Sequence, residues 1–144
     1  MRTRRAFLTA LVGLPLLGGI VIIWRDFAAI FGPRARAEQT VTAIIDFMFP
    51  GDGVPSAVSL GIADAIKGMP EFEALIPDGV AWLNSWAVRQ GAPDFISPDD
   101  DGKQRALEAA LASDNAIASE FVSSIRFYAG SIYYAEPGGR FRQC

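Results

Sequence analysis

This chain contains no histidine, and its one cysteine is the last residue, Cys144. Histidine is the commonest metal ligand and the side chain best suited to acid–base catalysis near neutral pH, so its absence excludes the usual sites of both kinds. A single cysteine excludes an internal disulfide, a CxxC zinc site and a CxxCH haem attachment. We interpret Cys144 as a free chain end, with a disulfide to a partner chain as the alternative.

The sequence also lacks a glycine-rich nucleotide loop, a phosphate-binding loop and a nucleophile elbow. Acidic residues are so numerous, at 16, that nominating any two of them as a catalytic pair would be arbitrary. We therefore predict that the chain is not an enzyme, has no catalytic residue and carries no cofactor of its own.

Charge is distributed unevenly along the chain. Residues 1–37 hold six arginines and one aspartate, a net charge of +5, whereas residues 38–144 hold 7 basic and 15 acidic groups, a net charge of −8. Such asymmetry is typical of a targeting segment attached to a separate globular body. An acidic body also argues against nucleic acid as a partner, because phosphate binding needs a basic face.

The N-terminus resembles the bacterial twin-arginine export signal, S/T-R-R-x-F-L. The matching residues are Arg4, Arg5, Phe7 and Leu8, preceded by Thr3. The next 19 residues, Ala6 to Trp24, carry no charge and would cover about 29 Å as a helix, close to the thickness of a bilayer core. We expect a single span over residues 6–24 of the bacterial inner membrane, with the N-terminus cytoplasmic and the body periplasmic.

Cleavage of this leader is the alternative to retention. Ala35-Arg36-Ala37 has the small-x-small form of a signal cleavage site, which would release a chain that begins at Glu38. Charged residues separate this site from the apolar stretch, and that stretch is longer than a cleaved signal needs. We expect residues 1–37 to be retained as an anchor and residues 38–144 to form the body.

The body shows apolar residues at helical spacing and no sustained alternation of period two, which predicts an all-α fold of four to five helices. The first stripe is Val41, Ile44, Ile45 and Met48, ended by the breaker sequence 49–53. Further helices are expected from Ser56 to about Lys67, from about Asp78 to Gln90, from Ser97 as N-cap onward, and from about Asn115 to Ala135.

Two groups of residues are candidate sites. Asp99, Asp101 and Glu108 nearly fit the spacing of a calcium-binding loop, although we interpret them as the acidic start of a helix. Aromatic residues that could anchor a partner protein lie at Trp82, Trp86, Tyr133 and Tyr134. Packing of these four side chains in the core is the alternative.

Three short stretches resemble the family of gluconate 2-dehydrogenase subunit 3. They are residues 44–52 (IIDFMFPGD), 57–64 (AVSLGIAD) and 133–139 (YYAEPGG). The resemblance covers roughly residues 38–139. It implies a small, non-catalytic subunit that assists assembly and export of a flavin-containing dehydrogenase and a multihaem cytochrome c at the periplasmic face. Flavin and haem would then belong to the partner subunits.

The sequence therefore predicts an accessory subunit of a membrane-bound periplasmic redox complex. One alternative keeps the fold and changes the partner, to a respiratory or photosynthetic membrane complex whose pigments or haems lie in other chains. A weaker alternative is a periplasmic module that binds calcium or another ligand.

Overall fold

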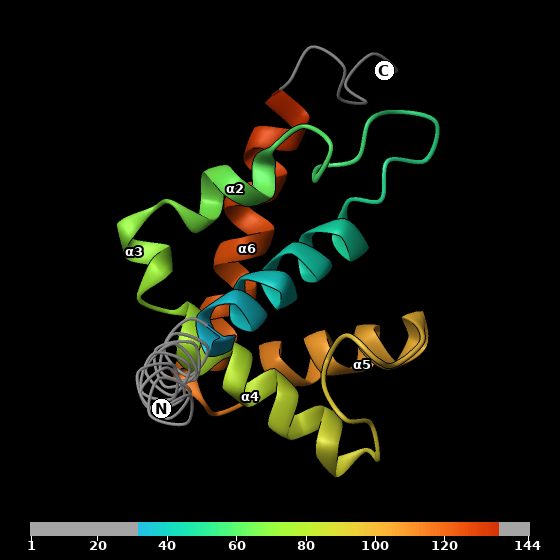
Figure 1. Ribbon diagram of the computed structural model, residues 1–144, viewed down its shortest axis with the longest axis vertical. Coiled ribbons are helices and arrows are strands. Elements are labelled where there is room, and N and C mark those ends of the chain that lie inside the picture. The colour runs from blue at the N-terminus through green and yellow to red at the C-terminus, as the bar shows by residue number, and fades with distance from the viewer. Residues whose placement is uncertain (1–31, 136–144) are drawn as a thin grey trace, which may run out of the picture. The chain divides into compact units, whose positions relative to one another are not determined.

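The computed structural model describes residues 32–135, and the structural statements that follow concern this range (Figure 1). The chain separates into two units, Met1–Arg36 and Ala37–Cys144, of which the second holds the folded body. The twin-arginine motif and the predicted span over residues 6–24 lie outside the described residues. Within the described residues, no helix is both long enough and apolar enough to cross a bilayer.

Helices are the regular elements of the described chain, which contains no strand, and this confirms the predicted all-α class. Its helices are 32–48, α2 (Ile62–Lys67), α3 (Pro70–Glu73), α4 (Ile76–Arg89), α5 (Asp100–Leu111) and α6 (Ala116–Ala135). The sequence did not predict α3, a single turn. Pro70 is its first helical residue. The N–H that proline lacks would have no partner within the helix at this position, so no hydrogen bond is lost.

The second helix begins later than predicted. Residues from Ser56 to Gly61 form turns, in which Ser56 Oγ accepts from the Ser59 N–H at 3.2 Å, and α2 begins only at Ile62. The predicted start of this helix at Ser56 is therefore wrong. Gly61 has a left-handed backbone (φ 73), which interrupts helical geometry and which glycine adopts without strain.

The start of α5 also differs from the prediction. Asp99, and not Ser97, is the N-cap, because its Oδ1 accepts from the Gly102 N–H at 2.9 Å. Ser97 instead donates both its N–H and its hydroxyl to Asp94 Oδ1, at 2.9 and 2.6 Å. The cap is thus two residues further along, and Pro98 precedes the helix instead of opening it.

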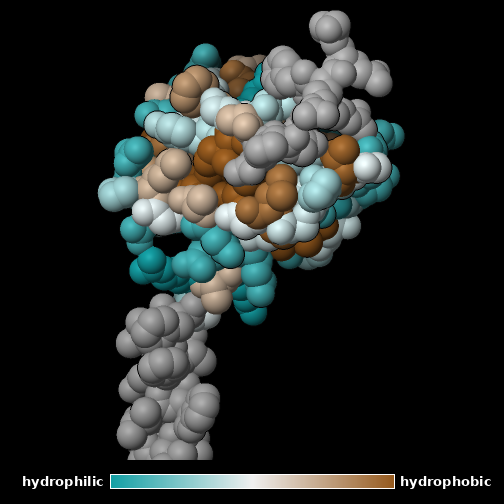
Figure 2. Space-filling view, turned by 90° about the horizontal axis from the view of Figure 1, so that it is seen from above, coloured by the Kyte–Doolittle hydropathy of each residue, from teal (hydrophilic) through white to brown (hydrophobic). Residues whose placement is uncertain are grey.

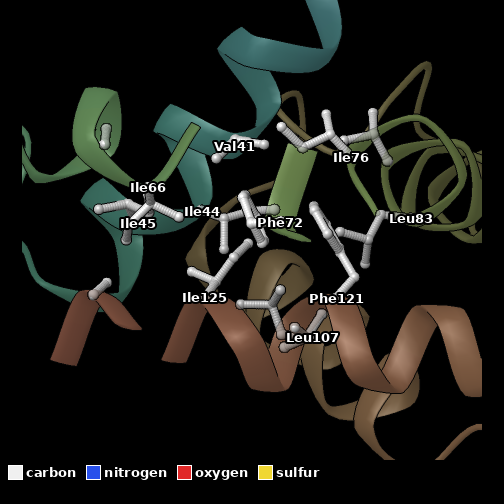
Figure 3. Close-up of a cluster of buried hydrophobic side chains, with 14 of the residues drawn as sticks. Val41, Ile44, Ile45, Ile66, Phe72, Ile76, Leu83, Leu107, Phe121 and Ile125 are labelled. Atoms are coloured by element: carbon white, nitrogen blue, oxygen red, sulfur yellow. The ribbon is translucent and has the colours of Figure 1, made fainter. Parts of the chain in front are cut away.

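Helix α6 is the central element of the fold. It packs against α2, α4 and α5 (Figure 1). The buried side chains of these elements and of helix 32–48 converge on it in one core (Figure 3). The largest fully buried side chains are Phe72, Phe95, Phe121, Ile44, Ile45, Ile62, Ile66, Leu83, Ile125, Val41 and Val122.

Phe121 of α6 contacts two other helices in this core. Its ring stacks on Phe72 of α3, with centroids 5.5 Å apart and planes 8° from parallel. On α4 it meets Gly79, where an added Cβ would overlap Phe121 Cγ. Any side chain at position 79 would therefore push α4 away from α6.

We predict that Gly79→Ala lowers the free energy of unfolding by about 1–3 kcal/mol, the usual penalty for overpacking a core. Thermal or denaturant unfolding of the purified chain measures it. Gly130→Ala in α6 is the matched control, since a Cβ there meets Phe49 Cζ at an ordinary 3.6 Å. The control should be unchanged or more stable by up to about 1 kcal/mol. Equal effects of the two changes would contradict this account of the α4–α6 contact.

Candidate functional site

The four aromatic residues predicted as partner anchors differ in their exposure. Trp82 and Trp86 of α4 are half-buried and pack against the core. Tyr133 is a core residue, 6% exposed, with its ring 5.4 Å from that of Phe49. It cannot act as a surface anchor, because helical rotation turns this position inward. Tyr134, the next residue, is exposed.

The calcium-loop candidates are not brought together. Asp99 caps α5, whereas Glu108 lies more than two turns further along the same helix and accepts from Gln104 Nε2 at 2.7 Å. A calcium loop must curl around the ion, but residues 100–111 are continuous helix. Within residues 32–135, no group of three or more acidic, histidine or cysteine side chains is placed to hold a metal ion.

A groove on the surface of α6 is the most distinctive feature of the body. One hollow of about 480 Å³ runs along α6 beside the end of α5, and a second of about 530 Å³ lies between α5, α6 and the end of helix 32–48. Both are lined by Leu111, Arg126, Gly130 and Tyr134, so they adjoin and form one surface. We call this surface the α6 groove.

Apolar side chains form much of the α6 groove. Phe127 is 67% exposed, the highest value among the large apolar residues of the described chain, and Leu111 and Tyr134 are also exposed. Phe47, Met48 and Phe49 line the other side. Figure 2, which views the body from the end where α6 stops, shows apolar side chains gathered among polar ones. Exposed apolar patches of this kind mark partner sites.

Charge in the α6 groove is sparse. Arg126 is exposed, and the structure gives it no ion-pair partner among residues 32–135. Glu108 lines the opposite wall and is already hydrogen-bonded to Gln104. Besides its apolar side chains, the lining thus carries one carboxylate, Glu108, and one cation, Arg126, that has no ion-pair partner among residues 32–135. That cation suits a protein segment with a carboxylate.

Sequence reasoning missed Phe127, Leu111 and Arg126 as candidate site residues. The available signal was the composition of α6, whose 20 residues include only two charges, Glu120 and Arg126. A helix this poor in charge has apolar residues on more than its core face. Which side remained exposed depended on how α6 packs.

We predict that Asp99→Ala lowers the free energy of unfolding by about 1 kcal/mol, as expected for a lost N-cap, with or without calcium. Asp101→Ala is the control, since its exposed carboxylate makes no cap and should matter less. Melting in millimolar calcium and then in chelator should give the same midpoint. A bound ion would add about 2.7 kcal/mol at a hundredfold excess over Kd, so a clear upward shift lost in Asp101→Ala would contradict this prediction.

Comparison with known proteins supports the resemblance seen in the sequence. The family model for gluconate 2-dehydrogenase subunit 3 matches residues 35–141, well over half of the chain. Comparisons with curated proteins and with solved structures return no significant match. The matched range contains α2 to α6, most of helix 32–48 and the whole α6 groove. On this evidence the chain belongs to the gluconate 2-dehydrogenase subunit 3 family.

Proposed function

We propose that this chain is a non-catalytic accessory subunit of a membrane-bound periplasmic redox complex that contains a flavin dehydrogenase and a cytochrome c. Family membership is the observation that carries the proposal, because the family is that of a dehydrogenase subunit. The α6 groove supports it, since an exposed apolar surface on a small domain fits a subunit held by larger partners.

The chemistry of the sequence is compatible with an accessory role. The 144 residues contain neither the glycine-rich loop of dinucleotide-binding flavin folds nor the CxxCH motif of covalent haem attachment. In this proposal the flavin and the haem belong to partner subunits. The role of this chain is to dock on them and to support their assembly and export.

The same proposal assigns the cellular location of the chain from its N-terminal leader, residues 1–37. Arg4 and Arg5 direct the chain to the twin-arginine route, and residues 6–24 anchor it in the inner membrane with the body in the periplasm. The candidate cleavage site at residues 35–37 lies inside helix 32–48, and proteolysis favours exposed, irregular segments over helices. That placement supports retention of the anchor.

We predict that the tagged full-length chain, purified in detergent from its native membrane, brings with it a flavin-containing dehydrogenase subunit and a cytochrome c. Mass spectrometry identifies the chains. After the subunits are separated, flavin and haem absorbance should remain with the partners. Recovery of pigment-binding or oxidase subunits would replace the dehydrogenase complex with another membrane complex, and a chromophore bound in stoichiometric amount to this chain would refute the non-catalytic role.

We also predict that the mature protein keeps its leader. The uncharged stretch of 19 residues is long enough to span the bilayer, so the native chain should stay with the membrane fraction through a carbonate wash. Intact mass and N-terminal sequencing check this. A native chain that begins at Glu38 would refute the anchor and leave export intact.

A further inference from the structure

We propose that the α6 groove binds a helix of a partner subunit, one with apolar side chains on one face and a carboxylate that pairs with Arg126. This inference rests on the proposed function, because it takes the partner to be another subunit of the same complex. Beyond the proposed function, the inference specifies which surface binds the partner, that the bound segment is a helix, and which charge orients that helix.

The two faces of α6 provide the first argument. The inward face carries the buried side chains, including Phe121, Ile125 and Tyr133. The opposite stripe, at spacings of three and four, lines the groove with Ser123, Arg126, Phe127, Gly130, Ser131 and Tyr134. A helix of a small domain ordinarily presents charged or polar residues to water, and this stripe has one charge. Its apolar part is best explained by cover from a partner.

The shape of the groove favours a helix as its occupant. Phe127 and Tyr134 are large and exposed, whereas Ser123, Gly130 and Ser131 on the same stripe are small. Ridges separated by small residues allow the ridges of a second helix to enter, with anchors spaced by three, four and seven residues. From Ser123 to Tyr134 the stripe covers about 16 Å, enough for three turns of a docked helix.

The interior packing of α6 does not require glycine at position 130. An added Cβ would meet Phe49 Cζ at 3.6 Å, which is an ordinary contact. Gly130 is nonetheless a member of the groove lining in both hollows. Its lack of a side chain leaves room in the lining for a side chain of a partner.

The charge of Arg126 favours one class of partner over the others. Burying the Arg126 charge without a carboxylate carries an energetic penalty, so the segment that fits best supplies an acid. A lipid surface is disfavoured because Arg126 and Glu108 would both enter apolar surroundings, and because the acidic body is repelled by anionic lipids. In a symmetric pair of copies joined groove to groove, Glu108 would be the one acid that the described lining offers, and it already accepts from Gln104.

The test measures how groove variants of the full-length chain bind in the purified complex. Phe127→Ser and Arg126→Glu should each weaken association with the dehydrogenase subunits by about 30-fold or more, the range of an interface hot spot. Both side chains are exposed, so melting of the variants should stay within a few degrees of the parent. Val88→Ser is the matched control, since Val88 is 58% exposed on α4 and lies outside the groove. It should bind as the parent does.

A photo-crosslinking residue at position 127 then identifies the occupant. The expected product joins position 127 to a helical peptide of a partner subunit with an acid on its apolar face, and exchanging that acid for arginine should restore binding to Arg126→Glu. Crosslinks to a second copy, to residues 136–144 of the same chain or to lipid would overturn the proposal. If the parent chain recovers no dehydrogenase subunit, the proposed function fails; if the parent does and the groove variants bind equally well, only this inference fails.

Discussion

The contact of Phe121 with Gly79 and Phe72 is the constraint on which the rest of the body depends. It brings α4 within reach of α6 at a point where even one methyl group would clash, and it stacks α3 on the same ring. Buried residues of helix 32–48, α2 and α5 complete the core around it (Figure 3). Since the Phe121 ring points inward, the rotation of α6 about its axis is determined, and so is the stripe that it presents outward.

The outward stripe connects this packing to function. With Phe121, Ile125 and Tyr133 turned to the core, helical geometry places Phe127 and Tyr134 at the surface. Helix 32–48 and α5 then border the stripe and give the groove its two walls. Among the described residues, the body therefore has a large apolar core and an apolar surface along α6, and a subunit of a dehydrogenase family has partners that could cover such a surface.

An accessory subunit needs a stable body and a recognisable face, and it needs no reactive groups of its own. The described residues of the groove fit that requirement, because aromatic and small side chains provide shape and Arg126 provides one directional charge. A single unpaired cation contributes more to specificity than to affinity, since it penalises any partner that lacks a matching acid. The groove would thus discriminate among subunits while its apolar part holds the correct one.

The sequence by itself determined the all-α class, the family and the approximate helices, because the spacing of Val41, Ile44 and Ile45 and the breakers at 49–53 are local signals. Hydrogen bonds and backbone rotation decided the ends, which is why Asp99 replaced Ser97 as a cap and Gly61 delayed α2. Only the tertiary structure decided that Tyr133 is buried and Phe127 exposed. When a helix has apolar residues on two sides, periodicity does not show which side is buried. In α6 the buried side is set by Phe121, which packs where Gly79 of α4 has no side chain.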